Sequence, residues 1–201
     1  MKEIILPQGY ISWSQLNLFE RNPKQYYKHY ILGEPSFVND AMIFGKKLAD
    51  ALEGNDAGDD ETITMLCSLL PKYKTMEKEL DAITGDIKIL GKIDNFNNRN
   101  KAFKEYKTGM VKWTQPKVDK HGQLLFYATL IYLTYGIIPP KIELVWAETK
   151  RDEDGQIYAT GRIEVFERKI KLVDILKFMA RICKTAKGIS RMYQDEIKKT
   201  F

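Results

Sequence analysis

Apolar and polar residues alternate in the middle of the chain, on either side of a short polar stretch. Ile87, Ile89 and Ile93 are separated by polar or small residues, and the alternation returns from Phe103 to Lys107. A period of two residues is typical of a β-strand. The Asn-rich stretch 95–101 between the two runs carries no apolar cluster and is typical of a turn. The pattern therefore predicts a β-hairpin.

Helices and further strands surround this hairpin. Apolar residues recur at helical spacing before the break at Asn22-Pro23, from Pro23 through Ile31, and over 41–53, 61–70, 123–135 and 170–182. Strand patterns occupy 142–148 and 156–167, and 73–82 leads into a first strand. The Gly- and Asp-rich stretch 54–61 lacks the spacing of a calcium-binding loop and is expected to be a surface loop. The basic stretch 184–201 is expected to be either a last helix or a loose tail.

These elements predict a single α/β domain over residues 1–201, with a mixed central β-sheet flanked by helices. Along the chain we expect N-terminal helices over 10–70, the hairpin over 85–109, a helix over 122–135, and C-terminal strands and helices over 141–201.

Composition narrows the class of protein without choosing a function. The 201 residues are 44% hydrophobic and 29% charged, which is an ordinary soluble profile. The sequence has no apolar run of membrane-spanning length and no signal-peptide pattern, so we expect a cytoplasmic protein with no membrane partner. A net charge of +5 is compatible with a polyanionic partner but does not require one. The two cysteines, Cys67 and Cys183, offer no zinc or disulfide pattern.

Candidate chemistry gathers on the predicted hairpin. Glu105 and Lys107 point to the same face of their strand because they are two residues apart. Folding about the turn is expected to bring Asp94 roughly opposite Phe103 and diagonal to Glu105. Two carboxylates grouped this way suit a hard cation such as Mg²⁺, and a lysine suits a phosphate reaction. The alternative is a surface hairpin with an ion pair of little energetic weight.

The same residues resemble the core of the PD-(D/E)XK nucleases, in their RecB-like and phage-exonuclease-like branch. Gly91-x-x-Asp94 is followed on the next strand by Glu105-x-Lys107, with Ile93 where the family has its proline. Two flanking segments extend the resemblance. The first is Ser12-x-Ser14-x-Leu16 together with the Tyr-rich helix after Pro23, and the second is Gln123-x-x-x-Tyr127. The resemblance runs from about Ser12 to Val165.

The resemblance implies a restriction-endonuclease-like core and a role for each matched residue. Asp94 and Glu105, helped by the Tyr106 carbonyl, would hold one or two Mg²⁺ or Mn²⁺ ions, and Lys107 would position the attacking water. Gln123 and Tyr127 would contact the scissile strand. The basic loop after the hairpin adds Lys112 and Trp113 as candidate nucleic-acid contacts, although it is equally an ordinary exposed loop.

The chain departs from the family pattern at two positions. Asn22 stands where several branches have a cysteine, and no C-terminal cysteine group exists, so we expect no iron–sulfur cluster. Ala49 stands where the family has a metal-binding histidine. Glu53, one helical turn later, is our candidate substitute ligand, with a solvated side chain as the alternative. Glu79 is a weaker acidic candidate before the hairpin.

The expected function is therefore that of a metal-dependent DNA nuclease. The resemblance implies exonuclease action or processing of single strands or duplex ends in recombination, repair or phage replication. The cell would be a bacterium or a phage-infected host, and the partners would be DNA and, in some settings, a recombination or replication protein. Two alternatives stay open: a nuclease-fold protein that binds DNA without cutting it, and an interaction domain with a fortuitous hairpin.

Overall fold

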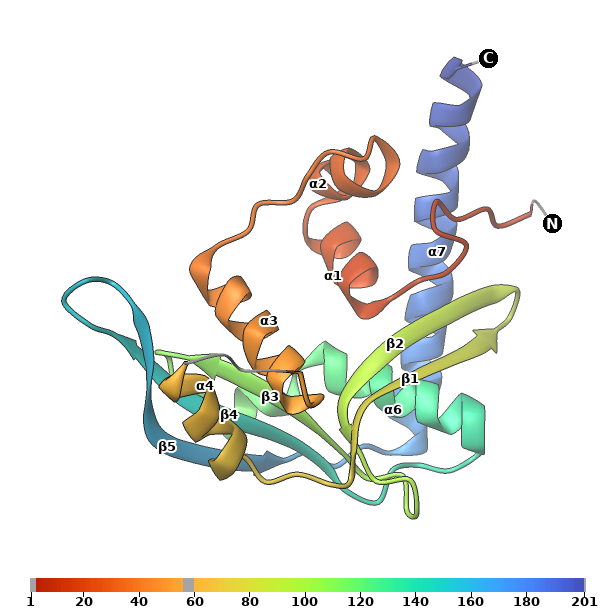
Figure 1. Ribbon diagram of the computed structural model, residues 1–201. Coiled ribbons are helices and arrows are strands. Elements are labelled where there is room, and N and C mark those ends of the chain that lie inside the picture. Colours follow the sequence, from red (N-terminus) through yellow and green to blue (C-terminus); the bar gives the residue numbers. More distant parts are fainter. Residues whose placement is uncertain (1–2, 56–59, 201) are drawn as a thin grey trace.

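A five-stranded mixed sheet with helices on both faces organises the chain (Figure 1). The fold is taken from a computed structural model that describes residues 3–55 and 60–200. The strands lie in the order of the sequence: β1 (Thr75–Thr84), β2 (Ile87–Phe96), β3 (Phe103–Gly109), β4 (Ile142–Arg151) and β5 (Ile157–Glu167). All neighbours are antiparallel except β3 and β4. The mixed α/β architecture expected from the sequence is confirmed.

The predicted hairpin forms from β2 and β3, but its register differs from the sequence-based expectation. Phe103 pairs with Phe96, and the ladder ends at the next pair, Asn95 with Lys104. Asp94 therefore does not lie opposite Phe103 and instead lies just beyond the paired region. On the freed edge of β2, the backbone of Ile11 exchanges hydrogen bonds with Lys88 and Leu90. The N-terminal segment thus replaces β3 where the two strands separate.

The parallel pairing of β3 with β4 requires a crossover connection, and two helices supply it. They are α5 (Gln115–Asp119) and α6 (Gly122–Tyr135). The stretch expected to be a basic loop thus contains a short helix. The helix expected over 122–135 is confirmed, and it ends at Gly136, which adopts the left-handed conformation that favours glycine.

Helices cover the two faces of the sheet unequally (Figure 1). One face carries α1 (Trp13–Arg21), α6 and α7 over a large apolar core, and the other carries α3 (Asp40–Leu52) and α4 (Glu61–Leu69) over a smaller one. Strand β4 is buried on both sides, so its side chains alternate between the cores: Leu144 and Trp146 enter the first, Val145 and Ala147 the second. Strands covered on both faces are typically continuous apolar runs.

The tyrosine-rich segment after Pro23 folds as two short pieces instead of one regular helix. Helix α2 (Pro23–Tyr26) begins at Asn22, whose side chain accepts a hydrogen bond from the Gln25 backbone N–H. A π-helical turn, η1 (Tyr27–Ile31), follows. Tyr26 is fully buried in the large core, so this aromatic side chain packs and does not stack with a ligand.

The C-terminal segment is one long helix, α7 (Leu172–Thr200). Both the expected end near residue 182 and the loose tail are therefore wrong, because Ala186 and Ile189 continue the apolar stripe into the core. The helix also holds the start of the chain: the Ile5 backbone N–H donates to Ser190 Oγ at 2.9 Å, and Gln194 Nε2 donates to the Glu3 carbonyl at 3.0 Å.

Among the described residues, no helix is both long and apolar enough to cross a membrane. Half of the loop expected over 54–61, residues 56–59, lies outside the described residues.

Gly91 allows β2 to pack closely against α6, which predicts a sharp cost for any side chain there. A Cβ at this position would lie 2.9 Å from both Leu130 Cδ1 and Tyr127 Cε1. We expect Gly91→Ala to lower the free energy of unfolding by about 1–3 kcal/mol, measured by urea denaturation. Gly45→Ala is the matched control, because nothing lies within 4 Å of that position inside α3. The control should stabilise the protein by roughly 0.5–1 kcal/mol, and equal effects of the two changes would contradict this packing argument.

Candidate active site

The backbone hydrogen bonds between β2 and β3 stop before Asp94, and beyond that point the Asp94 carboxylate accepts a hydrogen bond from β3. Its Oδ2 accepts a hydrogen bond from the backbone N–H of Tyr106 at 2.8 Å. A side chain on β2 therefore satisfies a donor on β3 that a ladder carbonyl would otherwise serve. This arrangement fixes Asp94 beside Glu105 at the point where the two strands part.

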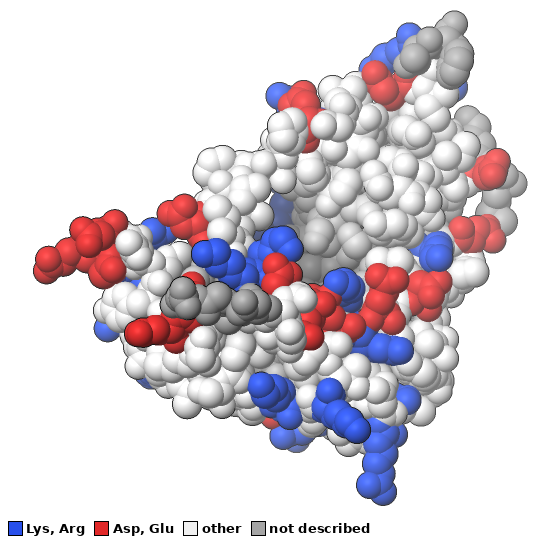
Figure 2. All heavy atoms as spheres, viewed as in Figure 1, with Lys and Arg blue, Asp and Glu red and all other residues white. Residues whose placement is uncertain are grey.

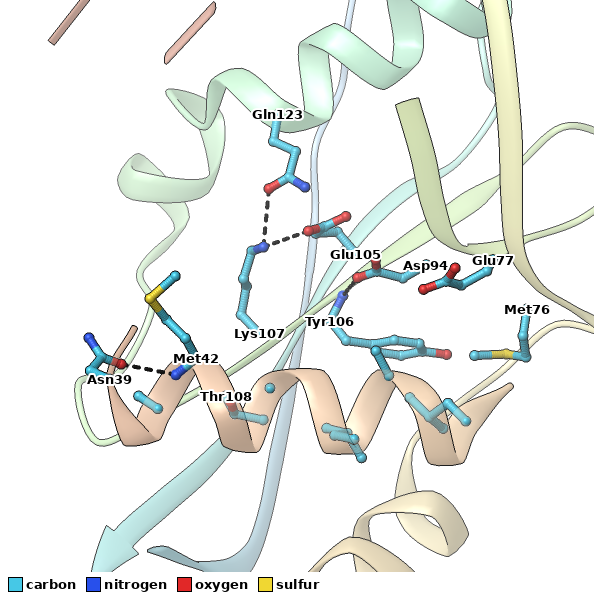
Figure 3. A pocket seen from close by; sticks show the side chains of 15 residues that line it. Asn39, Met42, Met76, Glu77, Asp94, Glu105, Tyr106, Lys107, Thr108 and Gln123 are labelled. Carbon is cyan, nitrogen blue, oxygen red and sulfur yellow. Dashed lines mark hydrogen bonds and ion pairs between the residues drawn. The ribbon is translucent and has the colours of Figure 1, made fainter. Parts of the chain in front are cut away.

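A chain of polar contacts runs from the hairpin to α6 (Figure 3). Lys107 Nζ donates to Glu105 Oε1 at 2.5 Å and to Gln123 Oε1 at 3.1 Å. Gln123 Nε2 in turn donates to the Tyr127 hydroxyl at 3.0 Å. Gln123 and Tyr127 lie one helical turn apart, so a single face of α6 presents both to the hairpin. The structure thus brings together the five residues that the sequence placed at the centre of the site, Asp94, Glu105, Lys107, Gln123 and Tyr127.

The two carboxylates are deeply buried and only partly compensated. The Glu105 side chain is 1% exposed, and its Oε2 accepts no hydrogen bond from the described residues, although a protonated Glu105 can share a hydrogen bond with the Asp94 carboxylate. Burial, followed by the nearby charge of Asp94, raises the pKa of Glu105 to about 8. Burial also raises the pKa of Asp94, although Lys107 and the Tyr106 N–H oppose that shift. Carboxylates in this state have unused capacity to bind a proton or a cation.

The neighbours of the carboxylates respond to the same negative charge. Burial alone would lower the pKa of Lys107, but the facing Glu105 and Asp94 raise it above its ordinary value, so the ammonium stays charged. Burial, assisted by the two carboxylates, raises the pKa of Tyr127 well above its ordinary value. Tyr127 is therefore a neutral hydrogen-bonding group, and Lys107 is the local positive charge.

Asp94, Glu105, Lys107 and Gln123 line one side of a cavity of about 550 Å³ between the sheet and α3, whereas Tyr127 does not line it (Figure 3). Helix α3 contributes Ala49 to the cavity wall, at the position where the resemblance implies a histidine. Glu53, the proposed substitute, follows the last residue of α3, is exposed, and does not line the cavity. The helix therefore offers an alanine methyl group to the cavity at that point, and none of the carboxylates of α3 lines the cavity.

Glu77 lines the cavity and is the residue that sequence reasoning missed. The weaker candidate Glu79 is exposed on the same strand. The signal that could have found Glu77 is the two-residue turn Gly85-Asp86, because a turn of that length fixes the register of a hairpin. Counting back from the turn places residue 77, and not residue 79, opposite Asp94.

The remaining candidates lie around the cavity without forming its wall. Lys112 is half exposed, and its Nζ pairs with Glu164 at 2.8 Å. The Trp113 ring packs edge-on against His121, with ring centroids 5.0 Å apart. Neither residue lines the cavity, whereas Tyr106 does.

Charge on this side of the molecule is mixed. Figure 2 shows basic and acidic side chains interspersed over the face that α3 covers, with no stripe of one sign. A partner that approached this face would therefore meet local charges at the cavity and not a broad positive surface.

Within residues 3–55 and 60–200, no three carboxylate, thiolate or imidazole groups lie close enough together to hold a metal ion. The pair of Asp94 and Glu105 is the nearest approach to such a site. What the geometry offers directly is two clustered carboxyl groups, one fixed ammonium and a hydrogen-bonded amide, all facing an open cavity. These groups suit the stabilisation and positioning of a charged, oxygen-rich substrate.

Comparison with known proteins gives a likeness of fold. No protein-family model matches the chain, and no curated protein sequence is similar to it. A crystal structure named "Putative exonuclease", from Eubacterium rectale, superposes with a TM-score of 0.61 at 13% identity, over 90% of this chain and 83% of that one. A second structure, SSO0001, has a TM-score of 0.49 at 16% identity over 94% and 78% of the two chains. The first likeness supports a nuclease-like fold, and the second is too low to identify one.

The buried state of Glu105 predicts a pH-dependent loss of stability. Its pKa rises from 4.5 in the unfolded chain to about 8 in the folded protein, so the folded protein retains a proton that the unfolded chain releases. Its contribution to the free energy of unfolding is therefore complete below pH 4.5 and is lost as the pH rises to 8. Glu105→Gln, which stays neutral, should escape that loss.

We compare the free energies of unfolding of Glu105→Gln and wild type in a chelator-containing buffer. The difference between them should shift in favour of Glu105→Gln by at least about 1.4 kcal/mol as the pH rises from 4.5 to 8. Urea denaturation at the two pH values measures the change. The exposed Glu79→Gln serves as the control and should track wild type throughout. If the free energies of unfolding of wild type and Glu105→Gln change with pH in parallel, the pKa of the Glu105 carboxyl is not raised in the folded protein.

Proposed function

We propose that the chain is a metal-dependent DNA nuclease with a PD-(D/E)XK core, acting as an exonuclease or on single strands and duplex ends. The observation that carries the proposal is the state of Glu105: a buried carboxylate with one unpartnered oxygen, adjacent to a second buried carboxylate and bonded to a lysine, at the side of an open cavity. The nuclease-like fold agrees with it.

The residues present fit a divalent cation. Asp94 and Glu105 carry up to two negative charges, while Lys107 supplies one positive charge. The unpartnered Glu105 Oε2 and the raised pKa values are what hard oxygen ligands show when no cation balances them. Asp94, Glu105 and the Tyr106 carbonyl would hold Mg²⁺ or Mn²⁺. Such an ion supplies Lewis-acid chemistry, by stabilising charge on the phosphoryl and leaving oxygens.

Lys107 and its partners would orient the reacting groups. The Lys107 ammonium has three donors, and Glu105 and Gln123 take two of them. The third can donate to the attacking water or to a phosphoryl oxygen. Because Gln123 is itself bonded to Tyr127, the position of the ammonium is set from α6 as well as from β3.

The substrate side of the proposal rests on the cavity and its surroundings. A volume of about 550 Å³ falls in the range of pockets for small organic ligands, so it can admit part of one nucleic-acid strand. Lys112 and Trp113 remain candidate contacts for the strand outside the cavity. A recombination or replication protein is a candidate partner that would deliver DNA.

One rival function has a specific observation in its favour. A nuclease-fold protein that binds DNA without cutting it would explain Ala49 in the cavity wall, where a ligand is expected. Against it stands the Glu105–Lys107–Gln123–Tyr127 network, because DNA binding alone has no need of a costly buried carboxylate. The third possibility, an interaction domain with a fortuitous hairpin, predicts no salt-dependent affinity for DNA.

Removal of the Lys107 ammonium should strongly reduce cleavage. Because Lys107 is the charge partner of the buried Glu105, its removal should also lower the free energy of unfolding, so the variant is assayed at a temperature where circular dichroism shows it folded. We expect Lys107→Ala to reduce the rate of cleavage of labelled single- and double-stranded DNA by about 10²–10³-fold in Mg²⁺ or Mn²⁺, because a preorganised donor to the reacting groups is lost. The chelator EDTA should abolish cleavage by wild type. Lys88→Ala is the matched control, since Lys88 lies on β2 with its side chain half exposed and paired with Asp81 away from the cavity.

Two results would contradict the proposal. Cleavage that survives Lys107→Ala would mean that the site is placed wrongly. No cleavage with either metal, together with DNA binding that weakens with salt and ignores Mg²⁺, would favour the non-cutting rival.

A further inference from the structure

Glu77 is the cross-strand neighbour of Asp94. The pairs on either side, Met76 with Asn95 and Lys78 with Ile93, fix this register. Side chains directly opposite each other on antiparallel strands share a face of the sheet. Strands β1, β2 and β3 therefore each bring one carboxylate to the same corner, from Glu77, Asp94 and Glu105, and all three line the cavity (Figure 3).

The backbone at Glu77 adopts an unfavourable conformation that no turn requires. Its φ is +41°, in the left-handed region that glycine favours, although the residue lies inside β1. The β1–β2 ladder omits only this position between Met76 and Lys78. Strain of this kind is retained when the surrounding structure gains from where the side chain is placed.

Two amide side chains of the cavity already have partners. Asn39 Oδ1 accepts from the Met42 backbone N–H at 3.0 Å, and Gln123 Oε1 accepts from Lys107. Ala49 has no polar side-chain atom. Glu77 is thus the third carboxylate available at this wall, and the unpartnered Oε2 of Glu105 marks a place where a positive ligand is lacking.

We propose that Glu77 is a third carboxylate ligand of the cation site, and that Lys92 holds it when no cation is bound. This inference rests on the proposed function, because it assigns a further ligand to the same site. In the structure, Lys92 Nζ pairs with Glu77 Oε2. Lys92 thereby occupies one oxygen of a carboxylate that Figure 3 shows beside Asp94, and the described residues form no group of three ligands.

A divalent cation can displace Lys92 from Glu77 because the ion pair between these two side chains contributes little stability. The Lys92 side chain is 56% exposed and that of Glu77 is 19% exposed, and the buried Glu77 Oε2 makes no hydrogen bond with the described residues, so the ion pair is open to solvent on the lysine side and contributes modestly. The cation would offer Glu77 a doubly charged partner shared with Asp94 and Glu105. Ala49 would then need no replacement on α3, since the third ligand comes from β1 on the opposite side of the cavity.

Titration with Mn²⁺ alone, followed by electron paramagnetic resonance, tests the inference without any measurement of cleavage. We expect Glu77→Gln to weaken Mn²⁺ affinity by about tenfold or more, as loss of a group that supports a metal site does. Glu79→Gln is the matched control: it removes the same charge from the same strand, from a residue paired in register with Lys92 but exposed. Lys92→Gln should tighten binding by up to about fivefold, because it frees Glu77.

The outcomes separate this inference from the proposed function. If wild type binds Mn²⁺ and Glu105→Gln does not, the proposed cation site stands. If Glu77→Gln then binds Mn²⁺ as tightly as Glu79→Gln does, the proposed role of Glu77 is overturned while the cation site stands. Wild type that binds no Mn²⁺ would remove both proposals, and unchanged affinity in Lys92→Gln would remove the role of Lys92. Glu77→Gly guards against misfolding, because glycine tolerates the positive φ while lacking the carboxylate, and it should also bind Mn²⁺ weakly.

Discussion

The burial of Asp94 and Glu105 side by side is the constraint around which the rest of the structure is arranged. Two adjacent carboxylates inside a protein oppose each other's ionisation and lose the hydration that they have in water. The structure offsets this cost with one backbone N–H from Tyr106 and one ammonium from Lys107. One carboxylate oxygen is nevertheless left without a partner. Folding alone would not favour such an arrangement, which is why the corner of the sheet points to chemistry.

Neighbouring elements are placed as this corner requires. The β2–β3 ladder stops before Asp94, and Ile11 takes up the backbone groups that become free on β2. The crossover from β3 to β4 places the start of α6 over the hairpin, so that Gln123 reaches Lys107. Gly91 lets α6 come close enough for Tyr127 to complete the network. Each of these features helps to fix the side chains of Asp94, Lys107, Gln123 or Tyr127.

The parts of this structure that sequence reasoning could predict are those that depend on local pattern. Alternation located the strands, helical spacing located α3, α4 and α6, and the order of short motifs brought Asp94, Glu105, Lys107, Gln123 and Tyr127 together. The parts that it missed depend on register and on tertiary burial. Glu77 was missed because its place follows from the pairing of β1 with β2, and its unfavourable φ leaves no trace in the sequence. The helical spacing that suggested Glu53 does not show that α3 ends one residue before it.

The contacts between the two ends of the chain have a consequence for the order of folding. Ile5 bonds to Ser190, 185 positions away, and the same N-terminal segment leads to Ile11, which completes the edge of β2. Closing a loop of that length is entropically costly, and contacts between distant residues slow folding. During synthesis on a ribosome, the N-terminal segment could form its contacts with α7 only after that helix has emerged. The β2 edge would therefore stay open until α7 has been synthesised, which leaves an exposed strand edge for chaperones to shield.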